Sequence, residues 1–83
     1  MQVRVAYFAM LRDLAGSDSE LFDLPDGSSV GMLLEAVGER HPDIAARRKH
    51  IAVVSGESYI DTGHKLKPGE EIALIPPVSG GCR

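Results

Sequence analysis

The strongest constraint on the fold of this chain is one amphipathic helix whose apolar side chains share a single face. These side chains recur at the i, i+3, i+4 and i+7 spacing of a helix face, at Val30, Leu33, Leu34 and Val37. Ser28 and Ser29 precede them and are suitable N-caps, and Pro42 sets the end of the helix. Since a helix with one apolar face must bury that face against another layer, we expect it to lie across a sheet.

The segments before and after this helix have the patterns of short strands. Residues 2–9 alternate, with Val3, Val5 and Tyr7 on one face and Phe8 on the other. Further strands are expected at residues 20–24, 51–55 and 71–75, with a short one at residues 59–60 and short helical segments at residues 11–15 and 43–50. This order implies one mixed sheet, its first and last strands parallel in the middle and the helix on one face. The expected fold is therefore α+β, of the β-grasp (ubiquitin-like) type.

The length of the chain leaves room for one core. Its 83 residues, 43% hydrophobic and 25% charged, are typical of one globular domain, which we place at residues 1–75 with an extended, flexible tail at residues 76–83. A domain of this size has little space for a deep catalytic pocket. The net charge of −3 has the wrong sign for binding a nucleic-acid backbone, so we expect no nucleic-acid partner.

Membrane proteins, secreted proteins and metal-binding proteins are disfavoured because the sequence lacks their usual signals. It has no run of about 18 apolar residues and no secretory signal, so we expect no membrane span and a cytoplasmic location. One cysteine cannot form an internal disulfide. His41, His50 and His64 lack the spacing of metal ligands, so we expect no metal site and interpret them as solvated or helix-end residues.

The tail combines two residue types that suit a thin, extended arm. It contains Pro76, Pro77, Val78, Ser79, Gly80 and Gly81. The prolines fix φ and keep the arm extended, while the glycines add no side chain. Six extended residues would reach on the order of 20 Å, which is enough to enter a partner protein.

Three segments carry a family resemblance: FAMLRDLAG at residues 8–16, LKPGEEIA at residues 66–73 and IPPVSGG at residues 75–81. Together they resemble the ubiquitin-like sulfur carriers of the MoaD and ThiS type, and in particular the small subunits of molybdopterin synthase, over residues 1–81. The last segment is the most specific of the three because it follows a β-grasp pattern.

The resemblance implies a function in molybdenum cofactor biosynthesis. In similar proteins an ATP-using adenylyltransferase, related to ubiquitin-activating enzymes, adenylates the terminal glycine carboxylate, because a carboxylate is a poor electrophile. A sulfur donor enzyme then forms a thiocarboxylate, and the sulfur passes to a pterin precursor in the large synthase subunit, within a heterotetramer. On this chain Gly81 would carry the 1-thioglycine, with Gly80 beside it. The chain would be a non-catalytic, sulfur-donating subunit with no active site and no bound cofactor of its own.

The resemblance also implies which residues contact partners. Phe8 and Arg12 lie in the first motif, and Pro76, Pro77, Val78 and Ser79 form the stem of the tail. Phe8 could lie under the helix or on the open face of the sheet, where it would dock the large subunit and the activating enzyme. The basic residues 47–49 are interpreted as a solvated helix end that could also dock an acidic partner.

The chain departs from the family after Gly81, where Cys82 and Arg83 follow. The carbonyl carbon of Gly81 is then part of a peptide bond, so the implied chemistry requires a trimming protease that cuts between Gly81 and Cys82. Similar carriers in siderophore thiolation have a two-residue extension that a metalloprotease removes. A retained precursor and a persulfide on Cys82 remain alternatives. Two other functions for the chain also remain alternatives to the molybdenum pathway. One is a sulfur carrier for thiamine, cysteine or siderophore synthesis, and the other is a ubiquitin-like modifier that forms isopeptide bonds.

Overall fold

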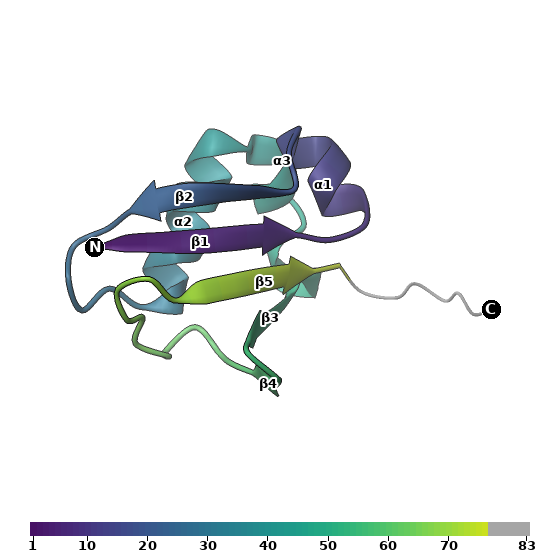
Figure 1. Ribbon diagram of the computed structural model, residues 1–83. Coiled ribbons are helices and arrows are strands. Elements are labelled where there is room, and N and C mark those ends of the chain that lie inside the picture. The colour runs from purple at the N-terminus through teal and green to yellow at the C-terminus, as the bar shows by residue number, and fades with distance from the viewer. Residues whose placement is uncertain (77–83) are drawn as a thin grey trace.

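The computed structural model describes residues 1–76 and confirms a mixed sheet with one main helix across it. The strands are β1 (Gln2–Tyr7), β2 (Ser19–Asp23), β3 (Ala52–Ser55), β4 (Ser58–Tyr59) and β5 (Glu71–Ile75), in the spatial order β2-β1-β5-β3-β4. β1 and β5 are parallel at the centre, and the other neighbouring pairs are antiparallel. Figure 1 shows the strands as one layer, with α2 (Val30–Arg40) behind it. The β-grasp prediction is confirmed.

The remaining helical segments are short. α1 (Met10–Ala15) follows β1, and α3 (Pro42–Ala45) and the 3-10 turn η1 (Arg48–His50) connect α2 to β3. Figure 1 places α1 and α3 at the same end of the molecule. Within residues 1–76, none of the helices is both long enough and apolar enough to cross a bilayer.

The core lies between α2 and the sheet. The helix buries the apolar face that its spacing predicted, through Val30, Leu33, Leu34 and Val37. The two central strands contribute the opposite wall, through Val3, Val5, Tyr7, Ile72 and Leu74. Burying one Val or Leu side chain stabilises the fold by about 1.5–3 kcal/mol. Packing therefore holds α2 in place despite two glycines in its sequence.

Local sequence signals set the start of α2 and the turn before β5. Ser29 is the N-cap of α2, and its hydroxyl oxygen accepts a hydrogen bond from the Met32 amide at 3.4 Å. Gly69 has a φ of 78°, and the Glu70 amide donates to the Lys67 carbonyl at 3.0 Å. The Pro-Gly turn expected before the last strand is therefore present.

Most element bounds differ from the sequence-based expectation by one residue, and two segments differ by more. β1 ends at Tyr7, because Ala9 adopts a φ of 54° and turns the chain out of the sheet. The helical segment expected at residues 43–50 is divided into α3 and η1, and it buries Ile44, which no signal in the sequence indicated. The reason is a close approach of α3 to α2: a Cβ atom added to Gly38 would lie 2.9 Å from Cβ of Ala45.

This close approach predicts opposite effects for alanine at the two glycines of α2. Gly38→Ala should lower the free energy of unfolding by about 1–3 kcal/mol, because the new methyl group displaces α3. Gly31→Ala is the matched control, since its Cβ would meet the nearest atom, the Thr62 carbonyl oxygen, at an ordinary 3.5 Å. That variant should be neutral or up to about 1 kcal/mol more stable because alanine favours a helix. Urea denaturation measures both values, and equal stabilisation by the two substitutions would contradict the packing of α3 on α2.

Candidate functional site

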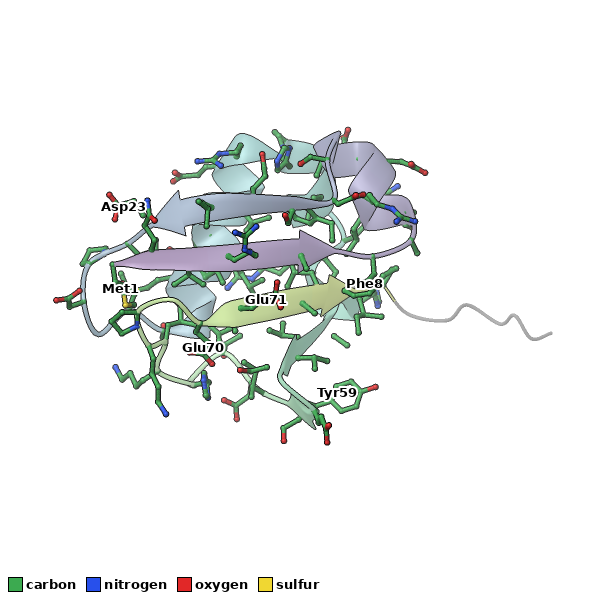
Figure 2. The ribbon with its side chains drawn as sticks, viewed as in Figure 1. Met1, Phe8, Asp23, Tyr59, Glu70 and Glu71 are labelled. Atoms are coloured by element: carbon green, nitrogen blue, oxygen red, sulfur yellow. The ribbon has the colours of Figure 1, made fainter. Side chains whose placement is uncertain are left out.

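The parallel pairing of β1 and β5 brings the first motif to the root of the tail. Parallel strands end at the same edge of a sheet, so Phe8, which follows β1, lies near Pro76, which follows β5. The Phe8 amide donates a hydrogen bond to the Leu74 carbonyl at 3.2 Å. Figure 2 shows the Phe8 side chain beside the C-terminal end of β5. Two predicted partner-binding residues, far apart in sequence, are thus brought together.

Phe8 lies on the open face of the sheet, with 47% of its surface exposed. This excludes the alternative in which it packs under the helix. The adjacent Ala9 has φ 54° and ψ −131°, a region that costs a non-glycine residue about 1–3 kcal/mol. The turn at Ala9 allows Leu11 to enter the core while Phe8 stays outside.

A shallow hollow of about 440 Å³ extends from Phe8 along the open face. Its floor consists of small side chains on three neighbouring strands, because Ala6 pairs with Ala73 and Ala73 pairs with Val54. Ser55, Gly56, Glu70 and Glu71 line the opposite end of the hollow. The surface is therefore apolar near the tail root and acidic at its far end, which suits a protein contact better than a small-molecule site.

Tyr59 extends this surface and was not found from the sequence. It pairs with Val54 and so belongs to the same cross-strand row, and 78% of its surface is exposed. Tyrosine is enriched at protein interfaces, so Tyr59 is a candidate partner contact. Its signal in the sequence was weak, since a strand of two residues has no alternation to show which face Tyr59 occupies.

The acidic end of the hollow is organised around the Glu70 carboxylate. The Ser55 hydroxyl donates to its Oε2 atom at 2.5 Å, the Lys67 amide donates to Oε1 at 2.8 Å, and His64 Nε2 lies 3.1 Å from Oε2. Burial would raise the pKa of Glu70, but the hydrogen bonds outweigh burial and hold the pKa below its ordinary value. His64 is therefore paired with a carboxylate rather than simply solvated.

Arg12 occupies a different depression from Phe8. It lies in α1, where its Nε atom is 3.7 Å from a carboxylate oxygen of Asp18, and the depression is also lined by Asp13, Gly16 and Ser17. The guanidinium remains largely exposed. Phe8 and Arg12 are the two residues of the first motif that were predicted to contact partners, and of these Phe8 alone lines the open-face hollow.

A second paired carboxylate joins β1, β2 and the end of α2. Glu20 Oε1 accepts a hydrogen bond from the Tyr7 hydroxyl at 2.7 Å and lies 2.7 Å from His41 Nε2. Burial opposes ionisation of Glu20, yet these hydrogen bonds and the charge of Arg40 keep its pKa below the ordinary value. His41 is the C-cap of α2, so its helix-end interpretation is correct. Residues 1–76 contain no group of three His, Cys, Asp or Glu placed to hold a metal ion.

The other residues predicted for the tail lie outside the described part of the chain. They are Pro77, Val78, Ser79, Gly80, Gly81 and Cys82. The site that can be described consists of Phe8, the open-face hollow and Pro76 at the root of the tail.

The chain matches known proteins over almost its whole length. Residues 5–81 match the model of the ThiS family. The molybdopterin synthase sulfur carrier subunit of Chlamydomonas reinhardtii is 37% identical over 83 residues, covering 98% of this chain and 100% of that protein.

Two solved structures are also similar. A putative molybdopterin converting factor, subunit 1, from Pyrococcus furiosus superposes with a TM-score of 0.85 at 30% identity, covering 94% of this chain and 99% of that one. Small archaeal modifier protein 1 from Haloferax volcanii superposes with a TM-score of 0.84 at 29% identity, covering 93% of this chain and 98% of that one.

The hydrogen bonds of Glu70 predict part of the acid sensitivity of the fold. Because the folded-state pKa lies below the ordinary 4.5, ionised Glu70 stabilises the fold above that pH and loses this effect as the pH falls through its lower folded pKa. Glu70→Gln should reduce stability by about 1–2 kcal/mol near neutral pH and should lose less further stability than the wild type between about pH 6 and pH 3.

The matched control is Glu71→Gln, which changes the neighbouring exposed carboxylate, one that makes none of the hydrogen bonds described for Glu70. Urea denaturation at a series of pH values should show wild-type acid sensitivity for this control. If Glu70→Gln and the wild type lose stability in parallel on acidification, the Glu70 network does not contribute as described.

Proposed function

The chain belongs to the ThiS family, and on this basis we propose that it is the sulfur carrier subunit of a molybdopterin synthase. The observation that carries the proposal is the 37% identity with a molybdopterin synthase sulfur carrier subunit along the full length of both proteins. The exposed Phe8 beside the root of the tail supports it, because a carrier needs a docking surface next to the group that it delivers.

The proposed chemistry takes place at the carbonyl of Gly81. A partner related to ubiquitin-activating enzymes uses ATP to convert the Gly81 carboxylate into an acyl adenylate, with release of pyrophosphate. The terminal sulfur of a persulfide on a donor enzyme then attacks the carbonyl carbon, and AMP leaves. A second thiol attacks the donor's own sulfur in the resulting acyl disulfide, which forms a disulfide between the two thiols and releases the thiocarboxylate. The product is a 1-thioglycine, whose sulfur passes to a pterin precursor in the large synthase subunit. The carrier itself needs no bound cofactor for these steps.

The sequence after Gly81 adds a requirement. Cys82 follows, so Gly81 has no free carboxylate until the bond between Gly81 and Cys82 is cut. We include a trimming protease among the partners for this reason. The same extension favours the alternative of a carrier for another thiolation pathway, in which the tail chemistry would be the same and the sulfur acceptor different.

The domain would contribute docking and presentation rather than catalysis. β5 lies between β1 and β3, so its end is held on both sides and sets where the arm begins. The open-face hollow, with Phe8 at one end, would contact the large subunit and the activating enzyme, together with Tyr59 on the strand that pairs with Val54. Arg12, on its own depression of α1, would form a separate polar contact with a partner.

A second candidate function is a protein modifier. It is favoured by the similarity to small archaeal modifier protein 1 at a TM-score of 0.84 and 29% identity. In this case the activated Gly81 carbonyl would be attacked by a lysine amine, and an isopeptide bond would replace the thiocarboxylate.

Mass spectrometry of the intact protein from its native cell distinguishes these functions. Loss of Cys82 and Arg83 with a gain of about 16 Da, from replacement of one oxygen by sulfur, is the result expected for the carrier. Lysine residues of other proteins linked to Gly81 would indicate the modifier instead. A full-length chain that persists while the cofactor is being made would overturn the proposed role of Gly81.

The docking role of Phe8 predicts a selective loss of affinity. Phe8→Ala, in a chain ending at Gly81, should weaken binding to the large synthase subunit about 30-fold or more, as expected when a central aromatic contact is removed. Leu21→Ala is the matched control, because Leu21 is also 47% exposed but lies on the edge strand β2. It should change affinity less than about threefold. Isothermal titration calorimetry measures both, and equal losses would remove the special role of Phe8.

A further inference from the structure

A run of basic residues lies close to the root of the tail but off the open-face hollow. Arg47, Arg48 and Lys49 precede β3, with His50 and Ile51 between them and the strand. The first residue of β3, Ala52, pairs with Ile75, the last residue of β5. Because these two strands are antiparallel, the start of β3 and the end of β5 share one edge of the sheet. A partner that holds the tail near Pro76 is therefore within reach of this basic segment.

The basic segment borders a hollow of about 540 Å³ that is separate from the open-face hollow. Its apolar lining includes Leu34, Ile51, Val53, Tyr59 and Ile60, and the exposed cationic side chains of Arg48 and Lys49 lie at its rim. Asp61 and Thr62 also line this hollow. An apolar floor with a cationic rim fits a protein segment that combines an apolar side chain with carboxylates.

The positive charge of the segment is not neutralised within the described residues. Arg47, Arg48 and Lys49 are three of the nine Lys and Arg residues of a chain whose net charge is −3, and none of the three forms an ion pair within residues 1–76. Arg47 donates to the Asp43 carbonyl at 2.8 Å, which holds its guanidinium without cancelling its charge.

Nearby carboxylates reduce this positive field only in part. Asp61 lines the same hollow, and Glu35 and Glu39 line a neighbouring depression together with Arg48. The three side chains of residues 47–49 are exposed, so their charges remain available to a partner.

We propose that Arg47, Arg48 and Lys49, together with the hollow that they border, form a second docking surface for an acidic segment of the adenylating partner. The inference rests on the proposed function, since it requires a partner that receives the tail. A carrier must meet and leave its activating enzyme in every cycle, and charge complementarity speeds such encounters without demanding a large apolar interface. The apolar open face suits the more stable complex with the large subunit.

Association kinetics test this assignment. The chain ending at Gly81 is mixed in a stopped-flow instrument with the purified adenylating enzyme of the same organism, and separately with the purified large subunit, over a range of salt concentrations. The double variant Arg48→Glu with Lys49→Glu should slow association with the adenylating enzyme about tenfold or more at low salt, with a smaller difference at high salt.

The matched control reverses the same amount of charge at a different place. Lys65 and Lys67 are also exposed, but they lie on the loop that leads into the start of β5, at the opposite end of that strand from the tail root. Lys65→Glu with Lys67→Glu should change the association rate less than about threefold. Thermal denaturation of both double variants verifies that each one is folded.

The outcomes separate this inference from the proposed function. Equal slowing by the two double variants would mean that net charge alone matters, and no slowing by either would mean that the basic segment is not a contact; both results overturn the inference. If the Arg48→Glu, Lys49→Glu variant slowed association with the large subunit alone, the assignment of the adenylating enzyme as the partner would be overturned. A wild-type chain that binds neither protein would overturn the proposed function, and this inference with it.

Discussion

The parallel pairing of β1 with β5 is the constraint on which the rest of the structure depends. It joins the first and last strands of the domain at the centre of the sheet, so that both end at the same edge. Phe8 after β1 and Pro76 after β5 are neighbours for this reason. The same pairing leaves β3 on the other side of β5 and brings the basic segment before β3 to the tail root. The surfaces proposed for partners therefore surround the point where the arm begins.

In the proposed function, the domain uses opposite faces of one sheet for stability and for recognition. α2 covers one face, and its apolar stripe meets Val3, Val5 and Ile72 in the core. The other face has a floor of small side chains with Phe8 and Tyr59 exposed at its margins. A domain of this size cannot contain both a large core and a deep active site. An open face beside the root of the tail is a binding surface that so small a core can support.

The sequence predicted those features that depend on a few neighbouring residues. The spacing of Val30, Leu33 and Val37 identified the buried face of α2, and the Pro-Gly turn located the start of β5. It did not predict that Ile44 is buried, because this depends on the contact of Gly38 with Ala45 across two helices. It also missed the carboxylate pairs of His41 and His64, whose partners are 21 and 6 residues away in the chain. No periodic pattern encodes such contacts.

The amino-acid order alone determined the strand and helix segments and the chemistry available to the arm. Those properties are local, since they follow from side-chain spacing, from proline and glycine, and from the peptide bond between Gly81 and Cys82. The tertiary structure decided that Phe8 faces outward and that Tyr59 shares its face of the sheet. It also placed residues 47–49 beside the root of the tail. These outcomes depend on which strands pair, and that choice is made by burying apolar side chains that are distant in the sequence.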